Sequence, residues 1–170
     1  HGFKGGTIGS AAGGHAATLF GGKLAAEQVS CFNGQFCLEK EVQYSSLDYN
    51  PILFSKLKTA GTKVENILLD VQGNTQIFYV YSNKSVSDVE QHSYVEGVKN
   101  LSCIAFDSSR HGIPFLKVAL PVFINLSAEE MESLSERNHH PVCFTIHCVG
   151  IWQTIGGFFR QAYNAYRKRR

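Results

Sequence analysis

Glycine is concentrated at the N-terminal end of this chain, and that concentration limits what the segment can fold into. Eight of the 16 glycines lie within the first 22 residues, so the composition changes sharply near Leu24. The 18 residues between Lys4 and Lys23 contain no Asp, Glu, Lys or Arg, a length at the lower limit for a membrane-spanning helix. Large apolar side chains are nearly absent there, however, which makes the segment a poor membrane span.

The spacing of these glycines is more informative than their number. Gly5, Gly9 and Gly13 recur every four residues, which places small residues in a stripe along one helix and lets helix backbones approach closely. We therefore expect residues 1–28 to form a separate helical segment for self-association or membrane contact, with a flexible linker as the alternative. The expected contact residues are Gly5, Gly9, Gly13, Gly14, Leu19 and Phe20.

Residues 29–170 have the pattern of one α+β domain. With 44% hydrophobic and 18% charged residues, the chain has ordinary globular composition, which excludes disorder and coiled coil for its bulk. Apolar runs and turn signals predict strands, whereas helical periodicity and two capping boxes predict helices. The capping boxes are Ser87-Asp88-Val89-Glu90 and Ser127-Ala128-Glu129-Glu130. The expected strands are 39–45, 64–71, 75–81, 101–107, 113–125 and 141–149; the expected helices are 87–99, 127–136 and 151–167.

From 75 to 149 the expected order is β-α-β-β-α-β, the ferredoxin-like split βαβ arrangement. It predicts an antiparallel sheet with helices on one face, flanked by the N-terminal Gly-rich helix and a C-terminal amphipathic helix. A hairpin across Gly73-Asn74 would join the strands 64–71 and 75–81. Pro121 argues against this order, because it lies in a strand that should be central and proline cannot donate to a central ladder. The strand therefore ends by Leu120 or contains a bulge.

The chain has five cysteines, an odd number, so at least one is unpaired or joined to another chain. Cys31 and Cys37 flank a five-residue loop that contains the turn signal Asn33-Gly34, and they are the disulfide candidate. The other three cysteines lie in apolar runs, where a buried free thiol is the usual state. These three are Cys103, Cys143 and Cys148.

The charge of the chain divides between a body and a terminus. The net charge of +2 results from 16 basic and 14 acidic residues, and the last four residues are all basic. Without those four the balance is 12 to 14, or −2, which disfavours a general nucleic-acid-binding field. Arg169-Arg170 is a candidate site of proteolytic processing in the secretory pathway, and a solvated basic helix end is the alternative. Sequons at Asn83, Asn100 and Asn125 also favour a secreted protein.

Known catalytic motifs are absent from the sequence, including the nucleophile elbow and the P-loop. His111 follows Ser108 and Ser109, but the neighbouring Asp107 would point away from it on a strand, so no carboxylate orients this histidine. A His/Cys cluster precedes the terminal helix, yet on a strand its members would lie too far apart to share one zinc ion. The cluster comprises His139, His140, Cys143, His147 and Cys148. We expect no catalytic residue, metal or cofactor.

The terminal helix 151–167 has the clearest amphipathic pattern of the chain. Apolar and aromatic residues recur at intervals of three to four, and charge gathers at the C-terminal end. Packing of the stripe on the protein's own sheet is one interpretation. Contact with an anionic membrane or a partner is the other, with Trp152, Phe158, Phe159 and Tyr163 as contact residues.

The β-α-β-β-α-β order over 75–149, with a processing site at Arg169-Arg170, resembles the virally encoded killer toxins of smut fungi and the salt-mediated yeast killer toxin. This resemblance implies a secreted, non-enzymatic toxin that binds target cells and perturbs their membranes. It would act as a homo-oligomer through the N-terminal helix, with a second chain from the same precursor as a further partner.

Two other functions remain open on the sequence. One is an interaction module of a viral or cellular glycoprotein that is cut at a furin-like site, since the Gly-rich N-terminus resembles a fusion peptide. The other is an RNA-binding domain of the RNA-recognition type, which has the same order of elements. The run Phe115–Phe123 lacks the aromatic signature of that type, and the acidic body also disfavours nucleic acid as a partner.

Overall fold

The computed structural model describes residues 5–37, 75–135 and 137–168. Its four strands form one sheet in the order β1-β2-β3-β4, and every neighbouring pair is parallel. All four strands therefore end at the same edge of the sheet. The strands are β1 (Gly6–Ser10), β2 (Gln28–Phe32), β3 (Gln76–Ser82) and β4 (Leu101–Phe106).

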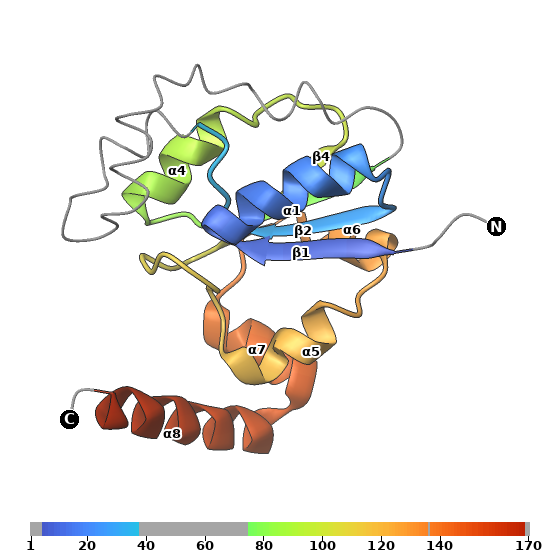
Figure 1. Ribbon diagram of the computed structural model, residues 1–170. Coiled ribbons are helices and arrows are strands. Elements are labelled where there is room, and N and C mark those ends of the chain that lie inside the picture. Colours follow the sequence, from blue (N-terminus) through green and yellow to red (C-terminus); the bar gives the residue numbers. More distant parts are fainter. Residues whose placement is uncertain (1–4, 38–74, 136, 169–170) are drawn as a thin grey trace.

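Helices cover both faces of the sheet (Figure 1). One face carries α1 (Ala12–Lys23) and α4 (Val86–Ser93). Four short segments lie on the opposite side: a 3-10 turn, η1 (Lys117–Ala119), and the helices α5 (Leu120–Phe123), α6 (Ala128–Ser135) and α7 (Pro141–Val149). The last helix, α8 (Ile151–Arg167), packs on α7 and η1 and lies farthest from the sheet.

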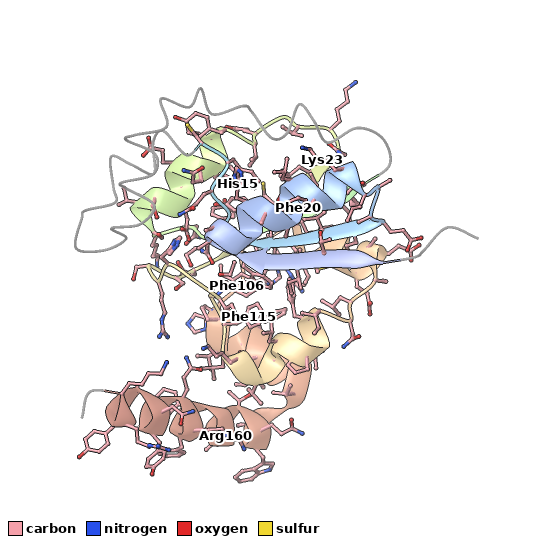
Figure 2. The ribbon with its side chains drawn as sticks, viewed as in Figure 1. His15, Phe20, Lys23, Phe106, Phe115 and Arg160 are labelled. Atoms are coloured by element: carbon pink, nitrogen blue, oxygen red, sulfur yellow. The ribbon has the colours of Figure 1, made fainter. Side chains whose placement is uncertain are left out.

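The sheet separates two hydrophobic clusters, because successive side chains of a strand point to opposite faces. On β3, Ile77 and Tyr79 belong to the cluster beneath α1 and α4. Phe78 and Val80 belong to the other cluster, which is rich in phenylalanine. Figure 2 shows Phe106 and Phe115 of this second cluster between the sheet and the helices on that side. A parallel strand buried on both faces reads as a continuous apolar run, as β3 does.

The predicted antiparallel sheet with helices on one face is wrong, because all the strand pairs are parallel. The predicted strand 75–81 corresponds to β3, which pairs in parallel with β2 and β4. The predicted strand 101–107 corresponds to β4. The predicted strands 39–45 and 64–71 lie outside the described residues, and so does the predicted turn at Gly73-Asn74.

The error in topology comes from two apolar runs that form helices instead of strands. Residues 113–125 contain η1 and α5, and Pro141–Val149 is α7. A short buried helix and a buried strand have similar apolar runs, so periodicity alone does not separate them. Proline does separate them here, since Pro121 and Pro141 each lie in the first turn of a helix, where no intrahelical N–H bond is lost.

Other helices agree with the sequence more closely. The predicted helix 151–167 is confirmed as α8. The second predicted capping box is also confirmed at the start of α6: the Ser127 amide donates to Glu130 Oε2 at 2.8 Å, and the Glu130 amide donates to Ser127 Oγ at 3.2 Å. The helix expected over 87–99 is shorter, and its cap is Ser85 rather than Ser87. Across the described ranges, no helix combines the length and the apolar character needed to cross a membrane.

The N-terminal glycines do not lie on one helix. Gly9 belongs to β1, Gly13 belongs to α1, and only one residue, Ala11, separates the strand from the helix. Two of the three buried glycines of α1, Gly14 and Gly21, pack on the protein's own sheet. A Cβ at Gly14 would lie 3.0 Å from Cys31 Sγ, and one at Gly21 would lie 2.5 Å from Val29 Cγ2.

Candidate functional site

A strained turn joins β1 to α1 at the carboxyl edge of the sheet. Ala11 has φ 52° and ψ −121°, and its amide donates to the Phe32 carbonyl at 2.9 Å. A residue with a Cβ is strained in this region of φ and ψ, at a cost of about 1–3 kcal/mol. Such strain persists where the surroundings impose it, and it is concentrated at functional sites. The turn at Ala11 is therefore the first element of a candidate site.

A glycine at position 9 makes this sharp turn possible. A Cβ on Gly9 would lie only 1.9 Å from the Gly13 carbonyl oxygen and 2.8 Å from the Gly14 amide nitrogen. The last part of β1 therefore contacts the backbone of the first turn of α1 directly. This contact across the turn requires glycine at position 9, and Gly9 does not share a helix face with Gly13.

An aspartate–histidine pair lies at the same edge. His111 Nδ1 is 2.7 Å from Asp88 Oδ1, and the Asp88 side chain is almost completely buried. Asp88 Oδ2 also accepts hydrogen bonds from the Ser82 amide at 3.2 Å and from Asn33 Nδ2. Because Asp88 has this many donors around it, its carboxylate is held in one orientation toward His111.

Backbone contacts fix the two loops that carry this pair. Asp88 lies in the first turn of α4, which follows β3, and the Tyr79 hydroxyl donates to its carbonyl at 3.1 Å. His111 lies in the loop after β4, where Ser82 Oγ donates to the Arg110 carbonyl at 2.7 Å. The end of β3 thus positions both the acid and the loop that carries the histidine.

Asn33 connects this pair to the turn at Ala11. It directly follows Phe32, the residue that accepts the Ala11 amide, and its side chain donates to Asp88. Asn33 is buried, and its Oδ1 has no hydrogen-bond partner among the described residues. The turn, the acid and the histidine therefore gather at the carboxyl edge of the sheet, the usual place for ligands in parallel sheets.

The order of these residues along the chain can be compared with that of the catalytic residues in one class of enzyme. In serine hydrolases built on parallel sheets, a Gly-x-Ser-x-Gly turn between strand and helix carries the nucleophile, and the acid and the histidine follow in that order. Here Gly9-Ser10-Ala11-Ala12-Gly13 forms such a turn, and Asp88 and His111 follow. The position of the nucleophile holds alanine, so this turn supplies no hydroxyl to accompany the acid and the histidine.

This site is not evident from the sequence, because the motif is defined by the serine that is absent. The two glycines that flank a change from strand to helix were the signal that could have found it. His111 was singled out, but its carboxylate is Asp88, 23 residues earlier, and the neighbouring Asp107 pairs with Lys84 at 2.6 Å. Asp88 itself was interpreted as part of a capping box.

The cysteines supply no substitute nucleophile in the sheet. Burial raises the pKa of Cys31 to about 12 and that of Cys103 to about 11, so both remain protonated thiols near neutral pH. All five cysteines are free, and the candidate disulfide between Cys31 and Cys37 is not formed.

The histidines and cysteines around α7 are not arranged as a metal site in the described residues. His139 Nε2 lies 2.7 Å from the Leu134 carbonyl oxygen and its ring contacts Phe144. Within the described part of the chain, no group of three or more His, Cys, Asp or Glu side chains is arranged to hold a metal ion.

A basic groove begins next to the histidine. Arg110 and Lys117 line one side of it, and residues of α8 line the other, around a volume of about 870 Å³. Three residues at the C-terminal end of the chain add cations to the groove, namely Arg160, Arg167 and Lys168. No aspartate or glutamate is among the lining residues, so the groove favours an anionic group.

The residues predicted for self-association are divided between two environments. Gly14 is buried and Leu19 packs against the cluster beneath α1, whereas the Phe20 side chain is 56% exposed. Figure 2 shows Phe20 on α1, between His15 and Lys23. Self-association through this helix stays a prediction, and the exposed residues Gly13 and Phe20 remain available for it.

Comparisons with known proteins identify no relative. No protein-family model, no curated protein and no solved structure matches the chain.

Proposed function

We propose that this domain is a non-enzymatic binding module with the architecture of a serine hydrolase. It binds a carbonyl-containing ligand, such as an ester or an amide, at the carboxyl edge of the sheet without cleaving it. This proposal rests on one observation. Ala11 has the backbone conformation of a nucleophile turn, but its side chain has no nucleophilic atom.

The remaining groups suit a polar ligand. Asp88 bonds to Nδ1 of His111, and this contact fixes the imidazole ring at the edge of the sheet where the ligand would bind. The first N–H groups of α1, at Ala12 and Gly13, have no partner within the helix, and groups of this kind can bond a carbonyl oxygen. Without a hydroxyl at residue 11, however, no covalent acyl intermediate can form.

The toxin hypothesis shares the non-enzymatic part of this proposal. Its resemblance to killer toxins rested on a β-α-β-β-α-β order with an antiparallel sheet, which the parallel sheet does not have. The RNA-recognition alternative rested on the same order. Secretion, processing at Arg169-Arg170 and binding to target cells stay predictions.

The proposal is tested by restoring the missing hydroxyl. The Ala11→Ser variant should hydrolyse p-nitrophenyl esters about 100-fold or more faster than the wild-type protein, which is the lower end for a positioned acid–base pair. It should also react covalently at residue 11 with a fluorophosphonate probe, detected as a mass increase. The double variant Ala11→Ser, His111→Gln is the control, and it should return to the wild-type rate.

Two outcomes would contradict the proposal. If the wild-type protein hydrolyses the esters and is labelled by the probe, the domain is an enzyme that uses another nucleophile. The exposed Ser10 would then be the first residue to replace with alanine. If the folded Ala11→Ser variant is inactive and unlabelled, the turn and the Asp88–His111 pair do not form one site.

A further inference from the structure

The apolar face of α8 is turned toward solvent. Trp152 is 82% exposed, Phe159 66% and Tyr163 62%. The spacing of three to four residues places these side chains on one side of the helix, together with other exposed apolar residues. We call this surface the aromatic face of α8; its members are Trp152, Ile155, Phe158, Phe159, Tyr163 and Tyr166.

The way α8 packs explains why this face points outward. A Cβ on Gly157 would lie 2.7 Å from Val118 Cγ1, so the helix approaches η1 through a residue without a side chain. Thr154 is the one buried residue of the helix. Figure 1 shows that α8 lies below α5 and α7, and none of the labelled helices and strands covers its outer side. The alternative that the stripe packs on the protein's own sheet is therefore wrong.

The charges around this helix all have one sign. Residues 151–168 contain no aspartate or glutamate, and the other side of the helix carries Arg160, Arg167 and Lys168 at the basic groove. Arg110 and Lys117 stand across that groove. No ion pair found in the described ranges engages these five cations. This end of the molecule is therefore a positive surface beside an exposed aromatic face.

The positive charge beside the aromatic face of α8 determines which partner this face can bind. A second copy of the chain would bring two sets of unpaired cations together, and this repulsion disfavours a dimer through α8. An anionic lipid surface attracts the same cations and also accepts the apolar side chains. Tryptophan and tyrosine are the residues that favour the level of the lipid headgroups, and the aromatic face contains three of them.

We propose that α8 docks on bilayers that contain anionic lipids, with its aromatic face buried among the headgroups and upper acyl chains. The long arginine and lysine side chains of its other side reach the phosphate groups, as such side chains do at membrane surfaces. This inference goes beyond the proposed function, because it involves none of Ala11, Asp88 and His111.

The chain carries its own probe for this docking. Trp152 is the only tryptophan, and its side chain lies on the aromatic face. Mixing the protein with vesicles of phosphatidylcholine and phosphatidylglycerol should shift its emission to shorter wavelength as the ring leaves water. Binding should be at least about tenfold tighter than to vesicles of phosphatidylcholine alone, and it should weaken as salt is added.

Two sets of variants separate the apolar and the electrostatic contributions. The double variant Phe159→Ser, Tyr163→Ser should lose vesicle binding, measured by cosedimentation. The matched control Val86→Ser removes an apolar side chain of similar exposure on α4, and it should bind as the wild type does. The double variant Arg160→Gln, Arg167→Gln should lose the preference for the anionic vesicles. Circular dichroism confirms that each variant is folded.

Three results would overturn the proposal. One is a folded wild-type protein whose Trp152 emission does not change with either kind of vesicle. A second is equal binding to both kinds of vesicle, which would exclude an anionic surface as the occupant. The third is a concentration-dependent shift of the Trp152 emission without lipid, with dimers in sedimentation, because the face would then be covered by a second copy.

Discussion

Replacing Gly9 with alanine tests the contact between strand and helix on which the candidate site depends. The new Cβ would lie 1.9 Å from the Gly13 carbonyl oxygen, where ordinary contacts begin at 3.4 Å. The difference, 3.4 − 1.9 = 1.5 Å, must be made up by moving backbone, because no flexible side chain is involved. Overpacking of this kind costs about 3 kcal/mol in the free energy of unfolding, at the upper end of its usual range.

Gly13→Ala is the matched control, since a Cβ at that position meets nothing within 4 Å. Gly13 lies in the first turn of α1, and alanine there should stabilise the protein by up to about 1 kcal/mol by restricting the unfolded chain. The two variants should thus differ by up to about 4 kcal/mol, although their glycines lie only four residues apart in the sequence. For a domain of this size the difference corresponds to about 10 °C in Tm.

Thermal and urea unfolding, followed by circular dichroism, measure both variants against the wild type. If Gly9 and Gly13 lay on one helix, the two substitutions would have similar effects of the same sign. Free energies of unfolding that agree within about 1 kcal/mol would therefore refute the strand–turn–helix explanation of the glycine spacing.

Further predictions follow from the turn, a helix cap and the buried thiols. Ala11→Gly should raise the free energy of unfolding by about 1 kcal/mol, because glycine adopts a positive φ without strain; a lower Tm would contradict this. Ser127→Ala should cost about 1 kcal/mol by removing the cap of α6, measured by urea unfolding. Burial raises the pKa of Cys31 to about 12 from 9.0, so above about pH 9 the unfolded chain loses a proton that the folded protein keeps. Stability should therefore fall between about pH 9 and 12, by about 1 kcal/mol over the first pH unit, and Cys31→Ala should flatten this dependence in urea titrations. An aromatic disulfide reagent should modify the exposed Cys143 first, while Cys31 should react only at the rate of unfolding.

The elements that sequence alone located correctly have unambiguous patterns. The amphipathic period of α8 fits only a helix, and β3 and β4 are rich in β-branched or aromatic residues. The apolar runs that became α5 and α7 fit both helix and strand. Treating these two runs as strands was enough to change the predicted sheet from parallel to antiparallel.

The candidate site was harder to predict, because its parts meet only through the sheet. Nothing local links Asp88 to His111, since they follow different strands and come together where parallel strands end. The glycines were noticed, but a spacing of four residues is common to one helix face and to a turn between strand and helix. The backbone of Ala11 distinguishes the two, and it is visible only in the structure.

The alanine at residue 11 is one nucleotide substitution away from serine. The Asp88 carboxylate accepts the Ser82 amide and the Asn33 side chain as well as contacting His111, so its network does not depend on what residue 11 carries. The codons of alanine and one set of serine codons differ in their first base only. A single nucleotide change would therefore place a hydroxyl on this turn, at the edge of the sheet where Asp88 and His111 lie.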